Sequence, residues 1–541
     1  MDAKHIIDRY NVGKGQRSNF ESYWQTLHDY FYIESEDLNR SYAQGSELDA
    51  KVLFDSTTLE SADVFASGFM SYLTPPTSKW FRLSPRARAL REDKEVMGWF
   101  EDVADECHLA LNRSNYYDTM FSNYKSVGVY GTSVVYAEED LEDDIRFYNM
   151  PNKQVVINED SKGRVSEYFI EFEYTAQQVL EKFGVGALTN EMREELRPES
   201  SSTKKYKYVL YIAKRSARDV LKKDKKNLPI QATWVDVANK QVVDESGYNE
   251  FPAFCARFEK RPFIAWGFSP AMKSLPFARV LNAMAKTNLR GTMKGVDPAV
   301  AIPSDAFIMP FNQNPRAVNV YRKDKMTGGD IFPLGTFGNP QLGLQSVEYY
   351  SAMVKRVMYN DVFLAFDRIT KQMNNPEVQE RINEKMTMLG SATGRFISEM
   401  LNPAVQRTIG ILMRKGKLPP PPDVLIENPD YEIDCISQLA QAQRRSEFNS
   451  LMTGLGLVGQ IAQFDQSVLD KVNADKVVDM GWDIVGAPNR VLRTDEDIEN
   501  LRAVRAEMAQ QQMAMEQLKQ GMETAKIGTE ADANVAKAVA E

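Results

Sequence analysis

The sequence predicts an α+β fold that is predominantly helical, and three observations predict it. Apolar residues recur at intervals of three and four along most of the chain, which is the pattern of helices with one buried face. Between residues 133 and 258 the period changes to two, as in half-buried strands. A polar interruption at residues 366–375 separates two strongly periodic helices. The chain has 541 residues, enough for several domains or subdomains.

The N-terminal region, residues 2–73, is expected to be helical. Aromatic side chains such as Phe20 and Trp24 recur at helical spacing, which is typical of a core-facing stripe. The Thr74-Pro75-Pro76 sequence should end this region, because proline lacks the amide hydrogen that a helix needs. Two further helices are expected, at residues 96–112 and 118–130.

The region with a period of two should form a sheet. Ala238-Asn239 is expected to be a turn, and the lysine-rich run at 222–226 to be a solvated hairpin tip rather than a nucleic-acid contact. Six strands are expected, at residues 133–137, 154–158, 165–172, 206–212, 231–237 and 240–244.

A helix of different character should begin at Ser269-Pro270. Residues 269–294 contain no Asp or Glu, and four of their cations fall on one side of a helix at about 100° per residue. We expect this basic stripe to meet either DNA or the acidic surface of a neighbouring subunit or shell protein, and we favour the protein partner. The stripe consists of Arg279, Lys286, Arg290 and Lys294.

Residues 295–340 are rich in proline and glycine and look like a compact excursion between two helices, with short β pieces such as Ala317–Tyr321. The helix that follows should run over residues 341–365. After the polar interruption, Asn375 is suited to cap a new helix that begins at Pro376, because proline is favoured at the first helical position.

The C-terminal part follows a stiff linker, the proline run at residues 417–422. From about Asp434 the chain is expected to be helical again. A short coiled coil is a possible form of its last helix, because seven residues repeat at heptad spacing. They are Leu501, Val504, Met508, Gln511, Met515, Leu518 and Met522.

Residues that could support catalysis are few and scattered. The three histidines, His5, His28 and His108, have no metal-ligand spacing with one another or with a cysteine. Cys107-His108 is expected to be a structural pair. Three cysteines far apart give no disulfide framework and favour a reducing compartment.

Two other segments have compositions that suggest chemical motifs. Gly13-Lys14-Gly15-Gln16-Arg17-Ser18 lacks the spacing of a phosphate-binding loop, so a flexible loop between helices is expected there. The carboxylate pairs Glu138-Glu139 and Asp143-Asp144 are expected to be solvated, because neighbours in sequence do not by themselves form an acid–base site. The sequence therefore predicts no enzyme, no cofactor and no metal site.

The charge balance gives a further limit. A net charge of −9 argues against a broad basic face that grips nucleic acid, although it allows a channel through which nucleic acid slides. No run of about 18 apolar residues occurs, so no membrane span is expected. The N-terminus lacks the apolar core of a signal peptide, so export is not expected.

The order of several segments carries a family resemblance. The segments are 62–76 (ADVFASGFMSYLTPP), 79–83 (KWFRL), 130–133 (YGTS), 266–271 (WGFSPA), 399–404 (EMLNPA) and 416–419 (GKLP). In this order and spacing, over about residues 15–505, the chain resembles the head-to-tail connector, or portal, proteins of short-tailed bacteriophages of the T7-like and related groups.

This resemblance implies a ring of identical subunits, typically twelve, around a central channel at one capsid vertex. It implies a wing, a stem, a clip, a tunnel loop and a crown with a C-terminal barrel or mobile tail. The corresponding ranges are 1–264 for the wing, 265–294 and 341–365 for the stem helices, 295–340 for the clip, 366–375 for the tunnel loop, 376–425 for a long wing helix with the proline-rich linker, and 426–541 for the crown.

The resemblance also implies partners and contact residues. The partners are double-stranded DNA in the channel, the terminase large subunit, the major capsid and scaffold proteins, and tail adaptor proteins, with no membrane. The stripe on the first stem helix would contact DNA or the capsid. The expected tunnel-loop residues are Arg368, Ile369, Thr370, Lys371, Gln372, Met373 and Asn374, and the expected clip contacts are Arg316, Arg322, Lys323 and Lys325.

Two other function classes stay open at this point. One is a ring-forming scaffold or tail protein that never touches DNA, and the other, less favoured, is a DNA-packaging enzyme subunit. A nucleotide-binding loop or an acidic metal cluster would favour the enzyme, and the sequence has neither. The expected location is the virion, after assembly in the cytoplasm of the host cell.

Overall fold

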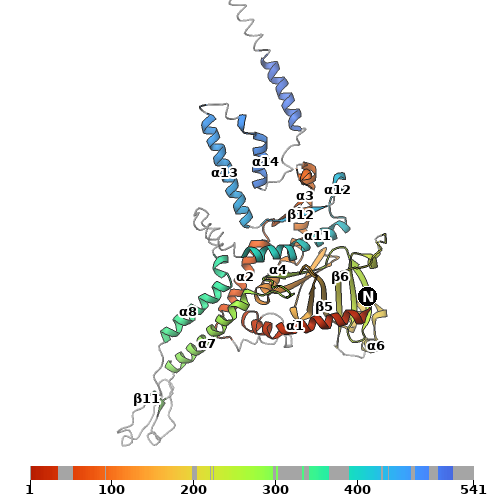
Figure 1. The fold of residues 1–541 in the computed structure, drawn as a ribbon, viewed down its shortest axis with the longest axis vertical. Helices are drawn as coiled ribbons and strands as arrows, with labels where there is room; N and C mark the ends of the chain where they lie inside the picture. Colours follow the sequence, from red (N-terminus) through yellow and green to blue (C-terminus); the bar gives the residue numbers. More distant parts are fainter. Residues whose placement is uncertain are drawn as a thin grey trace, which may run out of the picture. The chain divides into compact units, whose positions relative to one another are not determined.

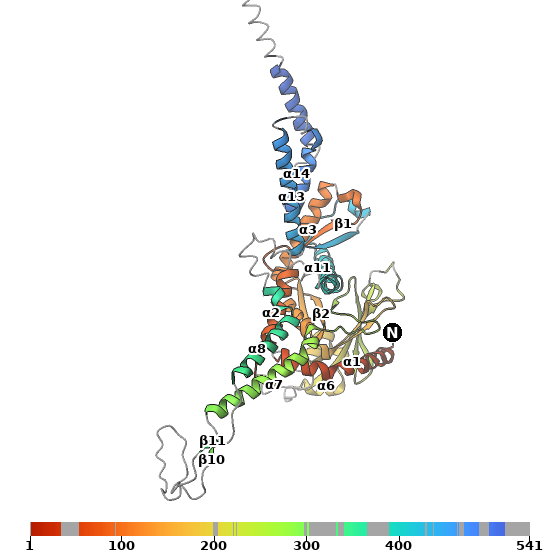
Figure 2. The same ribbon diagram turned by 60° about the vertical axis from the view of Figure 1, so that its left-hand side comes forward.

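The structure is a computed structural model, and it describes most of the chain (Figures 1 and 2). The described residues are 2–33, 53–91, 93–197, 204–219, 221–222, 224–296, 300–301, 332–333, 340–364, 389–427, 430–436, 438–462, 464, 470–485, 497–513 and 515. They form two compact units. The first contains residues 1–82, 103–418 and 433–441, and the second contains residues 83–102, 419–432 and 442–541.

The fold mixes helices and antiparallel sheets and is predominantly helical, as the periodicity predicted. The early helices have the predicted type and nearly the predicted limits, and the second ends at the residue before Thr74-Pro75-Pro76. They are α1 (Ala3–Phe31), α2 (Thr57–Leu73), α3 (Lys94–Arg113) and α4 (Tyr116–Tyr130).

The larger sheet of the first unit has five antiparallel strands in the order β4-β5-β6-β7-β8. All five were predicted, and the Ala238-Asn239 turn joins the last two. The exposed lysine run lies between β6 and β7, as expected for a hairpin tip. The strands are β4 (Val155–Glu159), β5 (Val165–Thr175), β6 (Lys205–Lys214), β7 (Ile230–Asp236) and β8 (Gln241–Tyr248).

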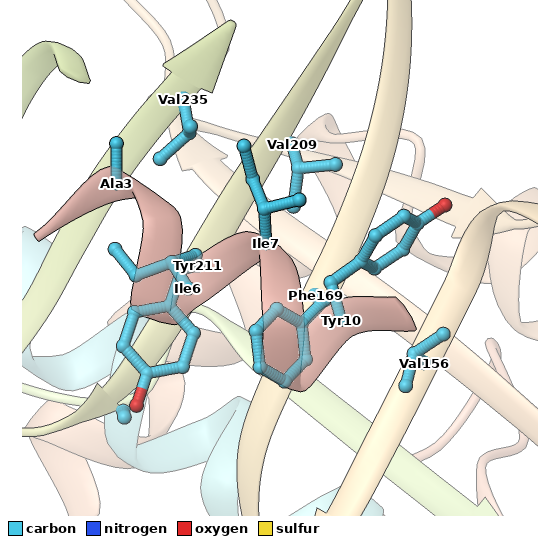
Figure 3. Packing of buried hydrophobic residues seen from close by; sticks show 10 residues of the cluster. Ala3, Ile6, Ile7, Tyr10, Val156, Phe169, Val209, Tyr211 and Val235 are labelled. Atoms are coloured by element: carbon cyan, nitrogen blue, oxygen red, sulfur yellow. The ribbon is translucent and has the colours of Figure 1, made fainter. Parts of the chain in front are cut away.

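Helix α1 packs against one face of this sheet, and Figure 3 shows the packing. Ile6, Ile7 and Tyr10 of α1 lie on Phe169, Tyr211 and other apolar residues whose positions alternate along the strands. Burial of this apolar face stabilises the helix far more than its intrinsic propensity does.

The prediction of a flexible loop at residues 13–18 is wrong, because α1 is continuous from Ala3 to Phe31. Gly13 lies so close to Val156 that a β-carbon on residue 13 would overlap the valine side chain. The glycine therefore serves a close helix–sheet approach, and packing offsets its helix cost of about 1 kcal/mol.

The other face of the five-stranded sheet carries an aromatic cluster. Phe172, Trp234 and Tyr208 alternate with the residues that face α1, and Phe183 packs on Trp234 at a ring distance of 5.2 Å. Phe183 belongs to α5 (Ala176–Phe183), which begins with a Thr175–Gln178 capping box. The short helix α6 (Asn190–Glu195) follows.

A second, three-stranded sheet has the order β3-β2-β9. Its middle strand was predicted, whereas its two outer strands were not. Gly131, at the end of α4, has φ +82°, and its backbone lies against the Gly267 carbonyl, so only glycine fits there. The strands are β2 (Thr132–Glu139), β3 (Ile145–Met150) and β9 (Ala253–Arg257).

The second unit is formed by separate pieces of chain. Trp99 of α3 donates from Nε1 to the Pro419 carbonyl at 3.0 Å, and Asp475 pairs with Arg502 at 2.6 Å. Leu501, Val504 and Met508 lie exposed on a helix over residues 497–513. Leu518 and Met522 lie outside the described residues.

The chain is again largely helical after the proline run, as expected, although one strand interrupts the helices. The elements are α12 (Asp423–Glu427), β12 (Tyr431–Cys435), α13 (Gln438–Ala462) and α14 (Ala474–Val485). Strand β12 pairs with β1 (Phe81–Pro85), and neither strand was predicted. Among the described residues, no helix is both long enough and apolar enough to cross a bilayer.

Candidate functional site

The candidate site is a pair of long helices that leave the body of the first unit side by side (Figures 1 and 2). They are α7 (Pro270–Val296) and α8 (Pro340–Val357). The Ser269 hydroxyl accepts from the Met272 amide at 3.0 Å and caps α7, and Pro270 follows it as predicted. Gly343 of α8 lies against the Asn288 side chain of α7, so the two helices approach closely at this point.

The chain between these helices leaves and returns through two paired strands. Val300 lies opposite Pro333, and Ala301 lies opposite Phe332, in antiparallel register. The strands are β10 (Val300–Ala301) and β11 (Phe332–Pro333). The two ends of this excursion therefore lie side by side at β10 and β11.

The helix pair changes from buried to exposed along its length. Leu275 and Leu281, near the body, are 3% and 1% exposed. Farther out, Met293 is 58% exposed and Leu342 of α8 is 62% exposed. Apolar residues exposed in a row on two adjacent helices are typical of a surface that another protein covers.

The predicted basic stripe lies on α7 as the spacing required. Arg279 and Arg290 are exposed, and Lys286 is half-buried with its Nζ 5.0 Å from the Phe54 ring centre. Lys294 lies in the same helix. The α7 and α8 sequences together contain seven Lys or Arg residues and a single acid, Glu348, although the whole chain has a net charge of −9.

The α8 helix stops at Val357, earlier than the expected 341–365 helix. Tyr359 has φ +60°, an unusual conformation for a residue with a side chain, and a short helical segment resumes at residues 360–364. The break allows the Phe363 ring to enter the space above Gly68 of α2, where a β-carbon would overlap it. Sequence periodicity did not reveal this break.

The two ends of the chain that flank residues 365–388 pack on the same aromatic residue. Phe69 of α2 lies 5.7 Å from the Phe363 ring on one side and 6.3 Å from the Phe396 ring on the other. Phe65 also contacts Phe363 at 5.8 Å, and Leu389 is 1% exposed. The chain on both sides of this segment, at Phe363 and at Phe396, therefore packs on the same part of the core. We call these two places the feet of the segment.

The second foot is also held by a buried arginine. A π-helical turn, Ile397–Leu401, presents Glu399 to Arg257, which is 0% exposed. Arg257 Nε donates to Glu399 at 3.0 Å, its Nη2 binds the same carboxylate, and its Nη1 binds Glu159. Burial disfavours the charged guanidinium, but the two carboxylates outweigh this and raise the pKa of Arg257.

The next helix, α11 (Asn402–Arg414), is fixed to the sheets by a second ionic cluster. Glu250 accepts from Arg407 at 3.0 Å and from Arg414 at 2.9 Å. The Glu250 carboxylate fits against Gly410, where a β-carbon would overlap it. The chain after the second foot is therefore joined to the body at successive turns.

A third ionic contact corrects the expectation for the acidic pairs. Asp144 is 6% exposed, and its carboxylate binds Lys417 at 2.7 Å and Lys415 at 3.1 Å. Glu139 also binds Arg414 at 2.8 Å. These carboxylates are therefore not simply solvated, because they anchor the chain that leads into the proline run.

We expect the Asp144→Asn protein to lose about 1.5–3 kcal/mol of stability at pH 7. Burial opposes ionisation of Asp144, but hydrogen bonds from Lys417 and Lys415 outweigh it and lower its pKa below 3.8. The contribution is complete above pH 3.8 and is lost as the pH falls through the lower folded-state pKa. Asparagine tolerates the φ of +68° at this position, so the backbone is preserved.

Urea unfolding of both proteins at several pH values checks this expectation. The difference in unfolding free energy should be present at pH 7 and should shrink at the acid end of the series. A difference that does not depend on pH would assign the effect to packing rather than to the carboxylate charge.

The structure places the histidine–cysteine pair in the core. His108 stacks on Phe81 at 4.1 Å, and its Nε2 lies 3.3 Å from the Phe81 carbonyl. Burial lowers the pKa of His108 to about 4, so the ring is neutral at physiological pH. Cys107 is buried as well, which supports the structural role expected for the pair. In the described part of the chain, no cluster of three His, Cys, Asp or Glu residues is arranged to hold a metal ion.

Many of the predicted contact residues cannot be placed. Arg368 to Asn374, the four clip residues Arg316, Arg322, Lys323 and Lys325, and Ala317–Tyr321 all lie outside the described residues. Sequence reasoning missed Arg257 as the partner of Glu399. The two are separated by 142 positions, and the only available signal was that Glu399 begins the EMLNPA segment.

Comparison with known proteins identifies the family. A family model described as bacteriophage head to tail connecting protein matches residues 3–492. The chain belongs to this family. The head-to-tail connecting proteins are structural proteins, and the resemblance seen in the sequence segments is confirmed.

Two members of known name match this connector over almost their whole length. The "Portal protein" of Salmonella phage epsilon15 is 28% identical over 527 residues, which cover 95% of this chain and 93% of that protein. The "Probable portal protein" of Bordetella phage BPP-1 is 26% identical over 540 residues, which cover 98% of this chain and 96% of that protein.

Proposed function

We propose that this chain is the subunit of a portal, the ring-shaped head-to-tail connector at one vertex of a bacteriophage capsid. The observation that carries the proposal is the family match over residues 3–492. In this function DNA enters the head through the central channel during packaging and leaves through it during ejection. The protein forms the channel and performs no chemical step.

The parts of the chain fit such a ring. Residues 1–264 and the chain after Pro376 form the wing, α7 and α8 form the stem, 295–340 forms the clip, and the crown begins near residue 426. The exposed apolar outer half of α7 and α8 supports the stem, since a ring covers it with neighbouring copies. The packing of Phe363 and Phe396 on Phe69 supports a tunnel loop between them, because both ends of the intervening segment lie at one place.

The partners follow from this arrangement. A ring of twelve subunits, in keeping with closed point groups, contacts double-stranded DNA through the tunnel loop, where Arg368 and Lys371 provide phosphate contacts. The clip binds the terminase large subunit during packaging and tail adaptor proteins afterwards, and the outer surface meets capsid and scaffold proteins. The assembled ring is a virion component that forms in the host cytoplasm.

Negative-stain microscopy of the purified protein tests the proposal. We expect closed rings with a central hole wide enough for a DNA duplex, at several salt concentrations. Closure follows from repeating one head-to-tail interface around an axis. A monomer, or a ring whose hole does not admit a duplex, contradicts the portal function.

A ring that never contacts DNA is the second candidate, and the net charge of −9 is the observation that favours it. The two candidates differ in their dependence on Arg368 and Lys371. Exchange of both residues for alanine leaves the ring intact in either case, but reduces DNA-filled heads only if the loop touches DNA.

A further inference from the structure

Phe263 combines two properties that are rare for an aromatic residue. Its side chain is fully exposed, at 103%, and its backbone has φ +62°. A bulky side chain in the left-handed region is strained, and a ring that packs on nothing within the chain gains no burial to offset that strain. Strain of this kind gathers at binding sites, so Phe263 is a candidate contact for a partner.

The loop that carries this residue is held firmly at its base. Two backbone hydrogen bonds join Glu259 and Phe268, at 3.1 and 2.7 Å. The Arg261 guanidinium stacks on the Phe268 ring, 3.8 Å from the ring centre. We call residues 259–268 the aromatic loop, and these contacts give the loop one defined position.

The surface beside the aromatic loop is basic. Lys260 donates to the Gly163 carbonyl, so the loop lies against the turn at residues 160–164. Three exposed cations belong to this turn and this loop, and they are Lys162, Arg164 and Arg261. The acids of the same region are already engaged with lysine side chains or with backbone amides of the turn, and they are Glu159, Glu259 and Asp160.

A second exposed apolar residue lies at the turn between β2 and β3. Leu141 is 99% exposed, and every other residue of the turn at 140–143 is acidic. Among the residues that the structure describes, no cation pairs with Glu142 or Asp143, and two nearby lysines bind Asp144 instead. We call residues 140–143 the acidic turn. Its charge is opposite in sign to that of the surface beside the aromatic loop.

Strand β2 places the aromatic loop and the acidic turn at opposite ends of the three-stranded sheet. Its first residue, Thr132, lies opposite Arg257, the last residue of β9, so the aromatic loop follows at that end. Its last residue, Glu139, lies opposite Ile145 of β3, so the acidic turn lies at the other end. The eight residues of β2 span about 25 Å. One copy therefore carries two complementary surfaces that are too far apart to contact each other.

We propose that the aromatic loop of one copy docks on the acidic turn of the next copy, with Phe263 packed on Leu141. Burial of both apolar side chains offsets the strain at Phe263, and the opposite charges set the direction of the contact. A contact between two different surfaces of one chain is head-to-tail, and its repetition closes a ring when the rotation permits. The inference rests on the proposed portal function, because it assigns an interface between neighbouring subunits of that ring.

Photo-cross-linking of the full-length protein tests the contact. The aromatic residue p-benzoylphenylalanine replaces Phe263 and, when irradiated, bonds to side chains that it touches. We expect cross-links to residues 140–143 of another copy, read by mass spectrometry in rings mixed from isotope-labelled and unlabelled chains. Because every copy has one loop and one turn, a denaturing gel should show a ladder of linked copies that continues beyond the dimer.

The matched control carries the same photo-reactive residue in place of Leu221. Leu221 is 93% exposed and precedes the lysine run at 222–226, but it belongs to neither the aromatic loop nor the acidic turn. We expect no ladder and no cross-link to the acidic turn from this position. The control therefore separates a specific contact from the reactivity of any exposed apolar site beside cations.

Substitution of the two apolar residues gives a second readout. Phe263→Ser and Leu141→Ser should each raise the concentration at which rings dissociate by roughly tenfold or more, measured by analytical ultracentrifugation. Neither side chain is packed within its own copy, so the unfolding of the isolated chain in urea should be unchanged. Leu221→Ser should alter neither quantity.

The outcomes separate this inference from the portal function. Rings that form without cross-links to residues 140–143 overturn the inference and leave the portal function standing. A ladder that stops at the dimer assigns the contact to a two-fold pair, and capture of added duplex DNA by residue 263 assigns the aromatic loop to nucleic acid, so each of these results overturns it as well. A protein that forms no rings in the microscope contradicts the portal function itself.

Discussion

The Arg257→Ala protein is expected to lose about 3–5 kcal/mol of stability, the cost of leaving partners of a buried ion pair uncompensated. Arg257 is fully buried and bridges Glu159 of β4 to Glu399 of the π-helical turn. It also donates to the Ala265 carbonyl at 3.2 Å. Its removal takes this donor from Glu399 and from the Ala265 carbonyl, and leaves Glu159 with Lys260 as its remaining cation.

Urea unfolding followed by tryptophan fluorescence measures this loss, since Trp24 and Trp266 lie in the first unit. Lys204→Ala is the control, because Lys204 and its partner Glu191 are 52% and 59% exposed. An exposed pair contributes little to stability, because solvent screens its charges. If Arg257→Ala lowers the unfolding free energy by no more than Lys204→Ala does, the buried ion pairs do not stabilise the chain around Glu399.

The Phe69→Ala protein is expected to lose about 3–5 kcal/mol and to loosen both feet of the 365–388 segment. Phe69 is 2% exposed and contacts Phe363 before the segment and Phe396 after it. A cavity at this position removes packing from both sides together. Amide exchange should therefore accelerate at residues 360–364 and 389–396.

Phe169→Ala is the matched control for this experiment. Phe169 is 0% exposed and of the same size, but it packs between α1 and the five-stranded sheet. Its loss should lower stability by a similar amount without selectively accelerating exchange at the feet. Equal acceleration in both variants at matched stability would show that Phe69 has no special hold on the segment.

The sequence was sufficient to predict those strands and helix ends that depend on one local pattern. Strand β6 was predicted because Tyr206, Tyr208, Leu210 and Ile212 occupy alternate positions, and this period of two is visible in the residues themselves. Strand β9 was missed because its five residues, Ala253–Arg257, show no alternation of polar and apolar side chains. The proline signal at residues 74–76 correctly predicted the end of α2, because proline disrupts a helix through its own backbone.

The rest depended on contacts distant in sequence. From sequence alone Gly13 suggests a loop, and only the structure shows that it lies against Val156. The break at Tyr359 likewise depends on the space above Gly68, which Phe363 fills. The stripe on α7 could be predicted from spacing, but its neighbour Phe54 could not. The predicted tunnel-loop and clip contacts stay predictions.

The buried Arg257–Glu399 pair also constrains how the protein is made. The ribosome synthesises Glu399 142 residues after Arg257, which takes about 7–28 s at 5–20 residues per second. During that interval Arg257 has Glu159 as a carboxylate partner but not yet Glu399. The first unit therefore completes this buried ionic network only late in translation.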